Sequence, residues 1–483
     1  MVKSAVFFSF VQRYGEQVIK LVALAVLSRL LTAEEFGVFA AAYAIATMAE
    51  SVGQFGVPTY LAQAAAIGPR ERRAAFSLTL CASGLGVVAM LVAGQVWAGL
   101  GSDGRIGDTI LLLAVWVGLG PLVTTWTGLL QRELAFRRLC TVGVLMSLAR
   151  AACSIALALA GFGLASLALG EIAGRLAQLA LLGRSGAARR DDVRFSWAAM
   201  REAFVYCAKR AGIALVTAGG NAAPALAAGT LLSFAAAGTY SRAQRVAGLF
   251  EIGFTQALQP VVQPALSRLR RRGGDMKAAY LTKSAILTGV GWPFLGLLAL
   301  MAAPLSAILL GPGWDDAVPV IQLLCLVGAT RALVLMNSEF YIATDMLDRL
   351  LRQQTVLLGF KIVAIFAFAL VSLEAMILSM TLPTLAVYVM AHRNLGRALG
   401  FTKREALGGL GRSALVTALC LVPGGLMLRE VQALDLPALL QIGLIATAGG
   451  LGWLLGVFLS GHPLAGEFKS AGRLAMARVH TLL

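Results

Sequence analysis

The sequence is poor in charge, and poorest in negative charge. Only 13% of its 483 residues are charged, and 41 Lys and Arg stand against 24 Asp and Glu. A soluble domain needs far more polar surface than this, so the composition excludes an ordinary soluble protein. The chain is 58% hydrophobic with a mean hydropathy of +0.80, which favours a lipid environment. At roughly 20 apolar residues per spanning helix, there is room for about fourteen spans and little else.

The sequence also lacks the motifs of metal, redox and nucleotide chemistry. Its six cysteines lie in or beside apolar stretches without paired spacing, and its three histidines lie far from any cysteine pair. We interpret the cysteines as small buried side chains, and we expect no metal and no cofactor. No G-x-x-x-x-G-K-S/T loop occurs, so the chain encodes no ATPase. The first apolar run is long and carries charges, which is typical of a retained helix rather than a cleaved signal.

Apolar runs bounded by charges, glycine or proline predict an all-α polytopic membrane protein, with boundaries good to about four residues. The predicted spans are 4–29, 36–62, 74–100, 107–130, 139–161, 164–183, 203–226, 233–259, 280–308, 317–342, 353–372, 375–392, 408–428 and 437–461. We expect an N-terminal lobe of six helices (1–183), a linker (184–202), a C-terminal lobe of six helices (203–397), two extra helices (398–462) and a tail (463–483).

The distribution of Lys and Arg tests this topology. With the N-terminus in the cytoplasm, the cytoplasmic segments hold twenty-six of the 41 cations and the opposite loops hold three, Arg29, Arg105 and Arg429. Cytoplasmic loops carry such an excess, and a span missed early in the chain would destroy the asymmetry. We therefore expect both termini in the cytoplasm. Because the cations are scattered between apolar runs, the net charge of +17 does not indicate nucleic-acid binding.

A weak internal repeat supports the two lobes. Gly37 stands at the opening of the second span and Pro58 near its end, while Gly238 and Pro260 stand at the equivalent places in the eighth span. The offset is about 201 residues in both cases. Repeated halves are common among transporters, and the substrate site then lies at their interface.

Besides Arg29 and Asp108 at span ends, seventeen charges lie inside the predicted spans, where each costs a few kcal/mol unless it meets water or a partner. The cations are Arg13, Lys20, Arg150, Arg175, Lys209, Arg210, Arg242, Arg245, Lys283, Arg331, Lys361 and Arg412, and the acids are Glu16, Glu50, Glu171, Glu251 and Glu339. Three of them, Lys283, Arg412 and Glu339, lie near a cytoplasmic edge, and the two cations can reach the interface along their stems. The i, i+4 spacing predicts that Glu16 pairs with Lys20 and Glu171 with Arg175.

The remaining cations exceed what structural contacts between helices require. Polar contacts between membrane helices usually involve single Ser, Thr or Asn residues, not several Arg on separate helices. Polar residues form stripes at helical spacing on the first two helices of each lobe. We expect these stripes to line a hydrated, cationic cavity. The predicted cations are Arg242, Arg245, Arg13, Lys20, Arg150, Arg175, Lys209, Arg210, Arg331 and Lys361, and the predicted polar lining is Gln17, Tyr43, Gln54, Tyr206, Asn221 and Gln256.

Such a cavity favours anions. The planar fork of Arg offers paired donors to phosphate, and the amide and hydroxyl side chains suit sugar hydroxyls. A pyrophosphate carrying a sugar chain would satisfy both groups. Glu16, Glu50, Glu171 and Glu251 are candidate ion-coupling sites, because a buried carboxylate can titrate near neutral pH.

Four stretches resemble the Wzx-type oligosaccharide-lipid flippases. They are RLLTAEEFG at 29–37, LQRELAFR at 130–137, GTYSRAQR at 238–245 with QAL at 256–258 and PALSR at 264–268, and LLGPGW at 309–314 with AVP at 317–319. The resemblance covers roughly residues 1–340. It implies the fold shared by MATE-type multidrug exporters and lipid-linked oligosaccharide flippases. Of the predicted cavity residues, Arg242 and Arg245 lie within a matched motif and carry the most support.

The resemblance further implies an undecaprenyl-pyrophosphate-linked repeat unit as cargo, moved to the periplasmic leaflet of the inner membrane before polymerisation. Candidate partners are this lipid-linked oligosaccharide, membrane lipid and the polysaccharide polymerase with its chain-length machinery. Alternatives are a lipid II flippase and a MATE-like drug exporter, although the excess of cations disfavours a cationic drug. A membrane glycosyltransferase is disfavoured because no opposite-side loop exceeds about a dozen residues under this topology.

Overall fold

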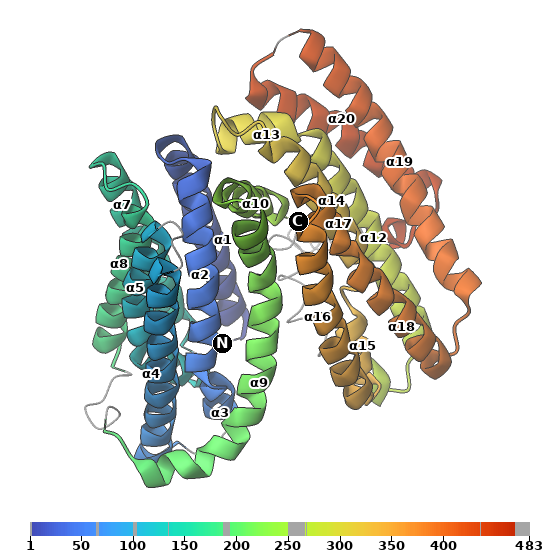
Figure 1. The fold of residues 1–483 in the computed structure, drawn as a ribbon. Helices are drawn as coiled ribbons and strands as arrows, with labels where there is room; N and C mark the ends of the chain where they lie inside the picture. The colour runs from blue at the N-terminus through green and yellow to red at the C-terminus, as the bar shows by residue number, and fades with distance from the viewer. Residues whose placement is uncertain are drawn as a thin grey trace, which may run out of the picture. The chain divides into compact units, whose positions relative to one another are not determined.

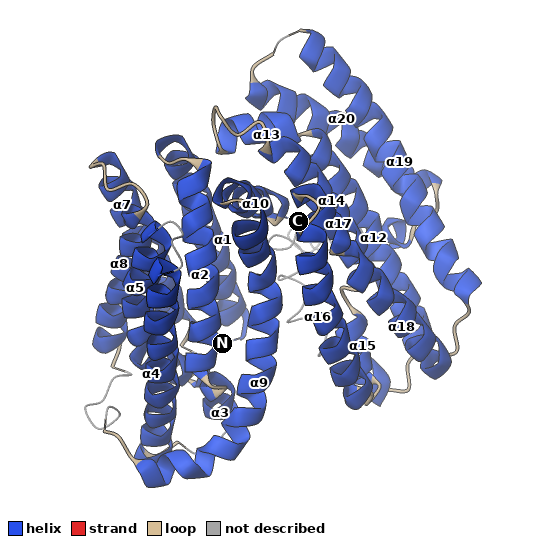
Figure 2. Cartoon of the chain, in the orientation of Figure 1, coloured by secondary structure: helices blue, strands red, loops and turns tan. Residues whose placement is uncertain are grey.

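The computed structural model describes residues 2–63, 67–99, 104–133, 135–186, 194–249, 266, 268–434 and 436–468. Within these ranges the chain forms helices joined by turns and loops, with no strand (Figure 2). The chain divides into two compact units. Unit 1 comprises Met1–Ser241 with Leu309–Gly311, and unit 2 comprises Arg242–Ile308 with Pro312–Leu483. Figure 1 colours unit 1 chiefly blue to green and unit 2 chiefly yellow to red.

Unit 1 is a helical bundle in which α2 is the more deeply buried helix and α7 is less buried. Its helices are α1 (Val2–Leu30), α2 (Ala33–Gln54), α3 (Val57–Gln63), α4 (Pro69–Gly99), α5 (Gly104–Gly118), α6 (Gly120–Arg132), α7 (Phe136–Leu159), α8 (Ala165–Arg184), α9 (Trp197–Ala227), the π-helical turn η2 (Ala228–Leu232) and α10 (Phe234–Ala247), whose second half falls in unit 2. Helix α2 packs against α4, α5 and α9, and α7 packs against both α1 and α8.

Unit 2 is built around α12. Its helices are α12 (Met276–Leu300), α13 (Ala302–Leu309), α14 (Ala317–Ala332), α15 (Asn337–Ala343), α16 (Leu347–Ala369), α17 (Leu373–Ser379), α18 (Thr381–Leu399), α19 (Lys403–Ala433) and α20 (Ala438–Leu459). Helix α12 packs against α14 and α19, and α19 pairs with α20. The two C-terminal helices that the sequence sets apart are therefore joined to this unit through α12.

Every predicted span overlaps at least one helix, and the chain is an all-α polytopic membrane protein. Among the described residues, ten helices are long and apolar enough to cross a membrane, or up to eleven if the bent pair α5–α6 counts as one span. The predicted spans outside this set correspond to α1, α9 and α10. These are three of the helices that carry the polar stripes.

Several predicted spans are broken rather than continuous, which corrects the sequence-based boundaries. The span predicted at 36–62 breaks where Phe55 and Gly56 adopt left-handed backbone conformations, with φ of 44° and 70°. The span predicted at 107–130 bends by 41° between α5 and α6. Pro121 lies just after this bend, and because proline has no N–H it cannot continue the hydrogen bonding of the preceding turn.

One end of unit 1 gathers the connections predicted to lie opposite the basic loops. Arg105 at the start of α5 forms an ion pair with Glu34 at the start of α2. The neighbouring Glu35 reaches the α7–α8 connection, where a Cβ on Gly163 would lie 2.7 Å from its carboxylate. Thr32 and Glu35 also form a capping box that fixes where α2 begins. Three connections far apart in sequence therefore share this end.

The other end of unit 1 gathers the arginine-rich connections. Arg132 donates to the carbonyl oxygen of Leu61 at 2.9 Å, and Arg138 donates to that of Ser185 at 2.9 Å. Arg70 of α4 pairs with Glu202 of α9 at 2.5 Å. Because the two sets of connections are segregated, the helices of unit 1 alternate between its two ends as the positions of Lys and Arg predict.

The cysteines depart in two cases from the expectation that all are buried, because Cys153 is half-buried and Cys81 is exposed. Cys140, Cys207, Cys325 and Cys420 are buried, and all six are free thiols. Cys81, however, is exposed. It lies on a face of α4 where Leu80 and Leu85 are also exposed, so its surroundings are an apolar outer surface rather than a core.

Candidate functional site: buried charges of unit 1

Two opposite charges meet inside unit 1. Arg175 of α8 donates to Oε1 of Glu50 on α2 at 2.9 Å. The two residues are only 7% and 8% exposed. The guanidinium also lies 4.4 Å from the ring centroid of Trp116 on α5, where a cation is attracted to the electron-rich face of the ring. Three helices are thus joined at one buried point.

A row of aromatic rings extends from this point towards the start of α2. The ring of Trp116 lies 5.7 Å from that of Tyr43, and the ring of Tyr43 lies 5.3 Å from that of Phe39. Phe39 and Tyr43 are one turn apart on α2, so their rings stack along one face of the helix. The predicted lining residue Tyr43 therefore contacts the charge network through Trp116, which no local sequence pattern marks as a site residue.

The second carboxylate oxygen of Glu50 faces the break between α5 and α6. A Cβ on Gly120 would lie 3.0 Å from this Oε2, so the glycine leaves room for the carboxylate. No donor of the described residues reaches Oε2 at hydrogen-bond distance, although Gln54 lies close enough to the carboxylate to interact with it weakly. One oxygen of Glu50 is therefore committed to Arg175, and the other is placed to take a proton or a small cation.

A second ion pair joins α7 to α8 and corrects the predicted pairing. Arg150 donates to Oε1 of Glu171 at 2.9 Å. The sequence predicts that Glu171 pairs with Arg175 along α8, and this is wrong, because Arg175 pairs with Glu50 instead. Pairing along the helix would leave Glu50 and Arg150 as buried charges without a counterion, which costs several kcal/mol. Pairing between helices satisfies all four.

The third group lies on α1, and here the predicted i, i+4 pair is confirmed. Lys20 lies 3.3 Å from Oε2 of Glu16, and Gln12 donates to its Oε1 at 3.0 Å. A Cβ on Gly143 of α7 would lie 2.5 Å from the amide nitrogen of Gln12, so the glycine makes room for this group. Glu16 also interacts electrostatically with Arg150, which links α1 to the pair on α7 and α8.

These six charges sum to zero. Glu16, Glu50 and Glu171 each have a cationic partner within unit 1. Within the residues that the structure describes, no group of three or more His, Cys, Asp or Glu is arranged to hold a metal ion. The network can fix helices α1, α2, α5, α7 and α8 relative to one another, and it can change that arrangement if one carboxylate takes up a proton.

The other predicted cavity residues are distributed over both units. Arg242 is buried and Lys361 half-buried, whereas Arg245 and Arg331 are exposed. Arg13 and Gln17 are half-buried, while Gln54 and Asn221 are exposed. Tyr206, Lys209 and Arg210 lie on α9, and their side chains are outside the described set, as are Glu251 and Gln256 entirely. Their roles as cavity residues stay predictions.

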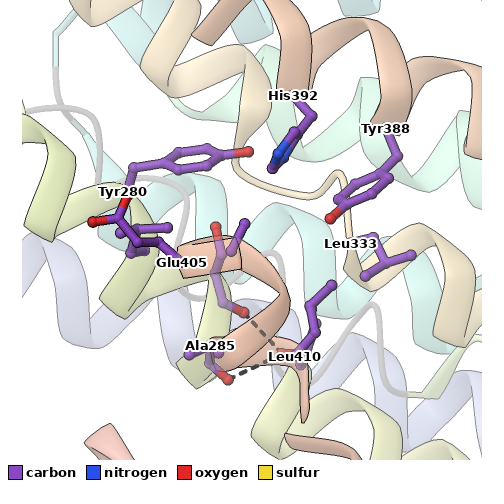
Figure 3. Close-up of a pocket in the computed structure, with 12 residues that line it drawn as sticks. Tyr280, Ala285, Leu333, Tyr388, His392, Glu405 and Leu410 are labelled. Carbon is purple, nitrogen blue, oxygen red and sulfur yellow. Dashed lines mark hydrogen bonds between the residues drawn. The ribbon is translucent and has the colours of Figure 1, made fainter. Parts of the chain in front are cut away.

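Unit 2 contains a small pocket, with a few polar side chains in a mostly apolar lining, that sequence reasoning missed. Tyr280 of α12, Tyr388 and His392 of α18 and Glu405 of α19 point towards it (Figure 3). Its volume of about 20 Å³ holds one water molecule and no sugar or phosphate group. Glu405 is engaged by Lys277 at 2.8 Å. The pocket is therefore a junction between helices, and no local sequence signal could reveal it because its residues come from α12, α18, α19 and the end of α14.

A larger groove in unit 2 is apolar. It has a volume of about 480 Å³ and lies between α12, α14 and α19. Trp292 and Leu295 line it from α12, Leu326 from α14 and Leu421 from α19. Its walls offer hydrocarbon contacts and little polar chemistry, so the groove differs in kind from the charge network of unit 1.

The described residues thus form an all-α membrane bundle that buries paired charges. Solved structures share its fold. An inward closed structure of the lipid II flippase MurJ matches with a TM-score of 0.67 at 14% identity, covering 94% of this chain and 98% of that one. An inward-facing multidrug resistance MATE family transporter of the MOP superfamily matches with a TM-score of 0.61 at 14% identity, covering 80% and 96%.

Sequence comparison then gives the family. The family model described as "Polysaccharide biosynthesis protein" matches residues 26–319, and the chain belongs to this family. A curated relative, the lipopolysaccharide biosynthesis protein WzxC of Escherichia coli (strain K12), is 22% identical over 316 residues. That match covers 65% of this chain and 64% of the relative, a little under two thirds of its length. The resemblance to Wzx-type proteins and the all-α fold shared with MATE-type transporters are thus confirmed.

Proposed function

We propose that this chain flips an undecaprenyl-pyrophosphate-linked oligosaccharide repeat unit from the cytoplasmic to the periplasmic leaflet of the bacterial inner membrane. Membership of the polysaccharide biosynthesis protein family is the observation that carries the proposal. A curated relative is named for lipopolysaccharide biosynthesis, and a solved structure of the same fold is named a lipid II flippase. A saccharide attached to a lipid is a cargo that fits both names.

The proposed topology has fourteen spans and two cytoplasmic termini. Helices α1, α9 and α10 supply the three spans beyond the eleven that hydropathy alone supports. Embedded charges such as Arg13 and Lys20 lower the mean hydropathy of α1. A low mean hydropathy is expected of a spanning helix that borders a polar pathway rather than lipid. The segregation of the two sets of connections in unit 1 supports the same topology.

The proposed binding groups are the cations of the second half of the chain. Between residues 203 and 397 the predicted spans hold seven Lys and Arg and only two acids, Glu251 and Glu339. A pyrophosphate would meet paired donors from Arg242 and Arg245. Amide and hydroxyl side chains such as Asn221 would receive sugar hydroxyls. The two lobes would alternate access to this site, as repeat-based transporters commonly do.

An antiporter for cationic drugs is the less favoured reading. It would need an acid free to meet the drug, but Glu16, Glu50 and Glu171 each face a cation. Glu50 is instead the best candidate for energy coupling, because one oxygen of this buried carboxylate is not engaged by Arg175. The membrane potential would add about 2.3 kcal/mol per charge for each 100 mV.

The binding proposal is tested by removing and then restoring two charges. Arg242→Ala with Arg245→Ala should abolish surface polysaccharide and cause lipid-linked repeat units to accumulate, whereas Arg242→Lys with Arg245→Lys should retain part of the export. The matched control is Arg393→Ala with Arg397→Ala, two exposed residues near the C-terminal end of α18, which should export normally. Normal export from the first double variant, at an equal amount of protein in the membrane, would refute the cationic site.

A complementation experiment distinguishes the proposed cargo from lipid II. If the chain restores growth to cells depleted of their lipid II flippase but does not affect the surface polysaccharide of its own host, the cargo is the peptidoglycan precursor. We expect the opposite result, in which only the surface polysaccharide depends on this chain.

A further inference from the structure

Helix α2 and the start of α10 meet backbone to backbone within unit 1. A Cβ built on Gly37 would overlap the carbonyl oxygen of Phe234, and one built on Gly238 would overlap the carbonyl oxygen of Ala33. The same Cβ of Gly238 would lie 3.0 Å from the backbone nitrogen of Gly37. Both glycines are buried. Small residues let membrane helices approach this closely, and here any larger residue at either position would force the helices apart.

The contact is reciprocal under the internal repeat. An offset of 201 residues separates Gly37 from Gly238 and also separates Ala33 from Phe234. Gly37 contacts Phe234, and the equivalent glycine, Gly238, contacts Ala33, which is the equivalent of Phe234. This is the pattern of a two-fold interface, in which residue i contacts j and the equivalent of j contacts the equivalent of i. The crossing thus joins equivalent points of the two halves of the chain.

Both helix starts at the crossing are held rigidly. The capping box of Thr32 and Glu35 fixes α2, and the ion pair of Glu34 with Arg105 ties it to α5. On the other side, the hydroxyl of Ser233 accepts from the amide of Ala236 at 3.0 Å and caps α10. The π-helical turn Ala228–Leu232 comes directly before it, and π-helical turns frequently mark functional positions in helices. Two rigid ends in contact can separate as bodies rather than deform.

The crossing lies at the end of unit 1 away from the arginine-rich connections. Ala33 adjoins Glu34, whose partner Arg105 belongs to the same end. The row Phe39, Tyr43 and Trp116 begins half a turn beyond Gly37 and leads to the pair of Glu50 with Arg175. The starts of α2 and α10 are therefore connected to the buried charges through side chains in direct contact.

From this geometry we propose that the Gly37–Gly238 crossing is the gate that closes the transport pathway at the end opposite the arginine-rich loops. Release of cargo at that end requires the starts of α2 and α10 to part, and the two glycines make the closed contact tight. The inference rests on the proposed transport function for its role, but its geometry can be measured without any cargo.

The first experiment measures the gate alone. Spin labels at Leu30→Cys and Ala235→Cys, two exposed positions beside the crossing, are placed in purified cysteine-free protein in lipid nanodiscs. The parent protein should show a short-distance population, and Gly37→Ala with Gly238→Ala should lose it. The matched control is Gly212→Ala on α9, where a Cβ meets nothing within 4 Å, and it should keep the short distance. An unchanged distance distribution in the double glycine variant would overturn the proposed contact.

The second experiment connects the contact to transport. In cysteine-free cells, Ala33→Cys with Phe234→Cys should form a disulfide on oxidation, stop polysaccharide export and regain it after reduction. Full export with the disulfide formed would refute the gate. If export never depends on the chain in any variant, the proposed function fails, while the spin-label distances still decide whether the crossing opens and closes.

Discussion

The two halves of the chain treat embedded charge differently. Away from the span ends, the first six predicted spans hold four cations and three acids, and all three acids are ion-paired inside unit 1. In the next six, seven cations accompany two acids. Because the mutual attraction of a buried ion pair offsets part of the desolvation cost of its two charges, the first half can use charge to hold helices together. The second half carries a cationic excess that suits an anionic ligand.

The largest effect should come from breaking the most buried pair. Glu50→Gln leaves the charge of Arg175 buried without its counterion, which should destabilise the protein by about 3–5 kcal/mol. Replacing both residues, as Glu50→Leu with Arg175→Met, removes both desolvation costs and should recover most of that stability. The thermal unfolding midpoint of the protein in nanodiscs measures both changes.

An exposed pair of the same chemistry in the same unit provides the control. Glu34 and Arg105 have half-exposed side chains, so Glu34→Gln should cost only about 0–1 kcal/mol. Equal losses from Glu50→Gln and Glu34→Gln would contradict the view that burial makes charge structural in the first half. A double variant no more stable than Glu50→Gln would contradict it as well.

A smaller effect distinguishes pairing between helices from pairing along one helix. In a double-mutant cycle, Arg150→Met and Glu171→Gln should show a coupling free energy of about 1–3 kcal/mol. The cycle of Arg175→Met with Glu171→Gln should couple far more weakly, by about 0.5 kcal/mol or less. Strong coupling in the second cycle would restore the i, i+4 pair that the sequence predicts.

These pairings mark the boundary of what the sequence could predict. The starts of α2 and α19 can be predicted from sequence, because Thr32 with Glu35 and Thr402 with Glu405 have the fixed spacing of a capping box. The pair of Glu16 with Lys20 can also be predicted, because its i, i+4 spacing is fixed along the helix. The partner of Glu171 could not be predicted in this way, because Arg175 on its own helix and Arg150 on α7 are both candidates. The choice depends on which other buried charges would lose their counterion.

Helix breaks and the contacts around them show the same limit. The sequence displays Gly120 and Pro121 inside an apolar run, but a single proline is compatible with a kink or with a new helix. The position of Trp116 over Arg175 follows from how α5 packs between α2 and α8, and nothing within α5 encodes it. Local spacing predicts elements, whereas the site depends on packing between them.

Unit 2 offers the contrasting case of a buried polar contact made by a neutral group. His462 follows α20 and is 1% exposed. Its Nε2 lies 3.1 Å from the hydroxyl of Ser413 on α19, and its Nδ1 accepts from the amide of Leu464 at 3.3 Å. Ser413 in turn lies 2.8 Å from the hydroxyl of Thr288 on α12. The segment that follows α20 is thus connected to α12 through the uncharged imidazole of His462 and the hydroxyl of Ser413.

The smallest predicted effect is the pH dependence of this contact. Burial is the main cause that lowers the pKa of His462 below its usual 6.5, and the nearby charge of Arg412 acts in the same direction. Below about pH 6.5 the unfolded chain binds a proton that the folded imidazole resists, so stability falls as the pH drops through this value and levels off below the folded pKa. In His462→Gln this part of the pH dependence should be absent, with a difference on the order of 1 kcal/mol or less. Thermal unfolding of both proteins between pH 5 and 8, a range chosen about the usual histidine pKa, measures it. Identical profiles would mean that the imidazole of His462 does not contribute to the pH dependence of stability, and the proposed neutral contact would then be refuted.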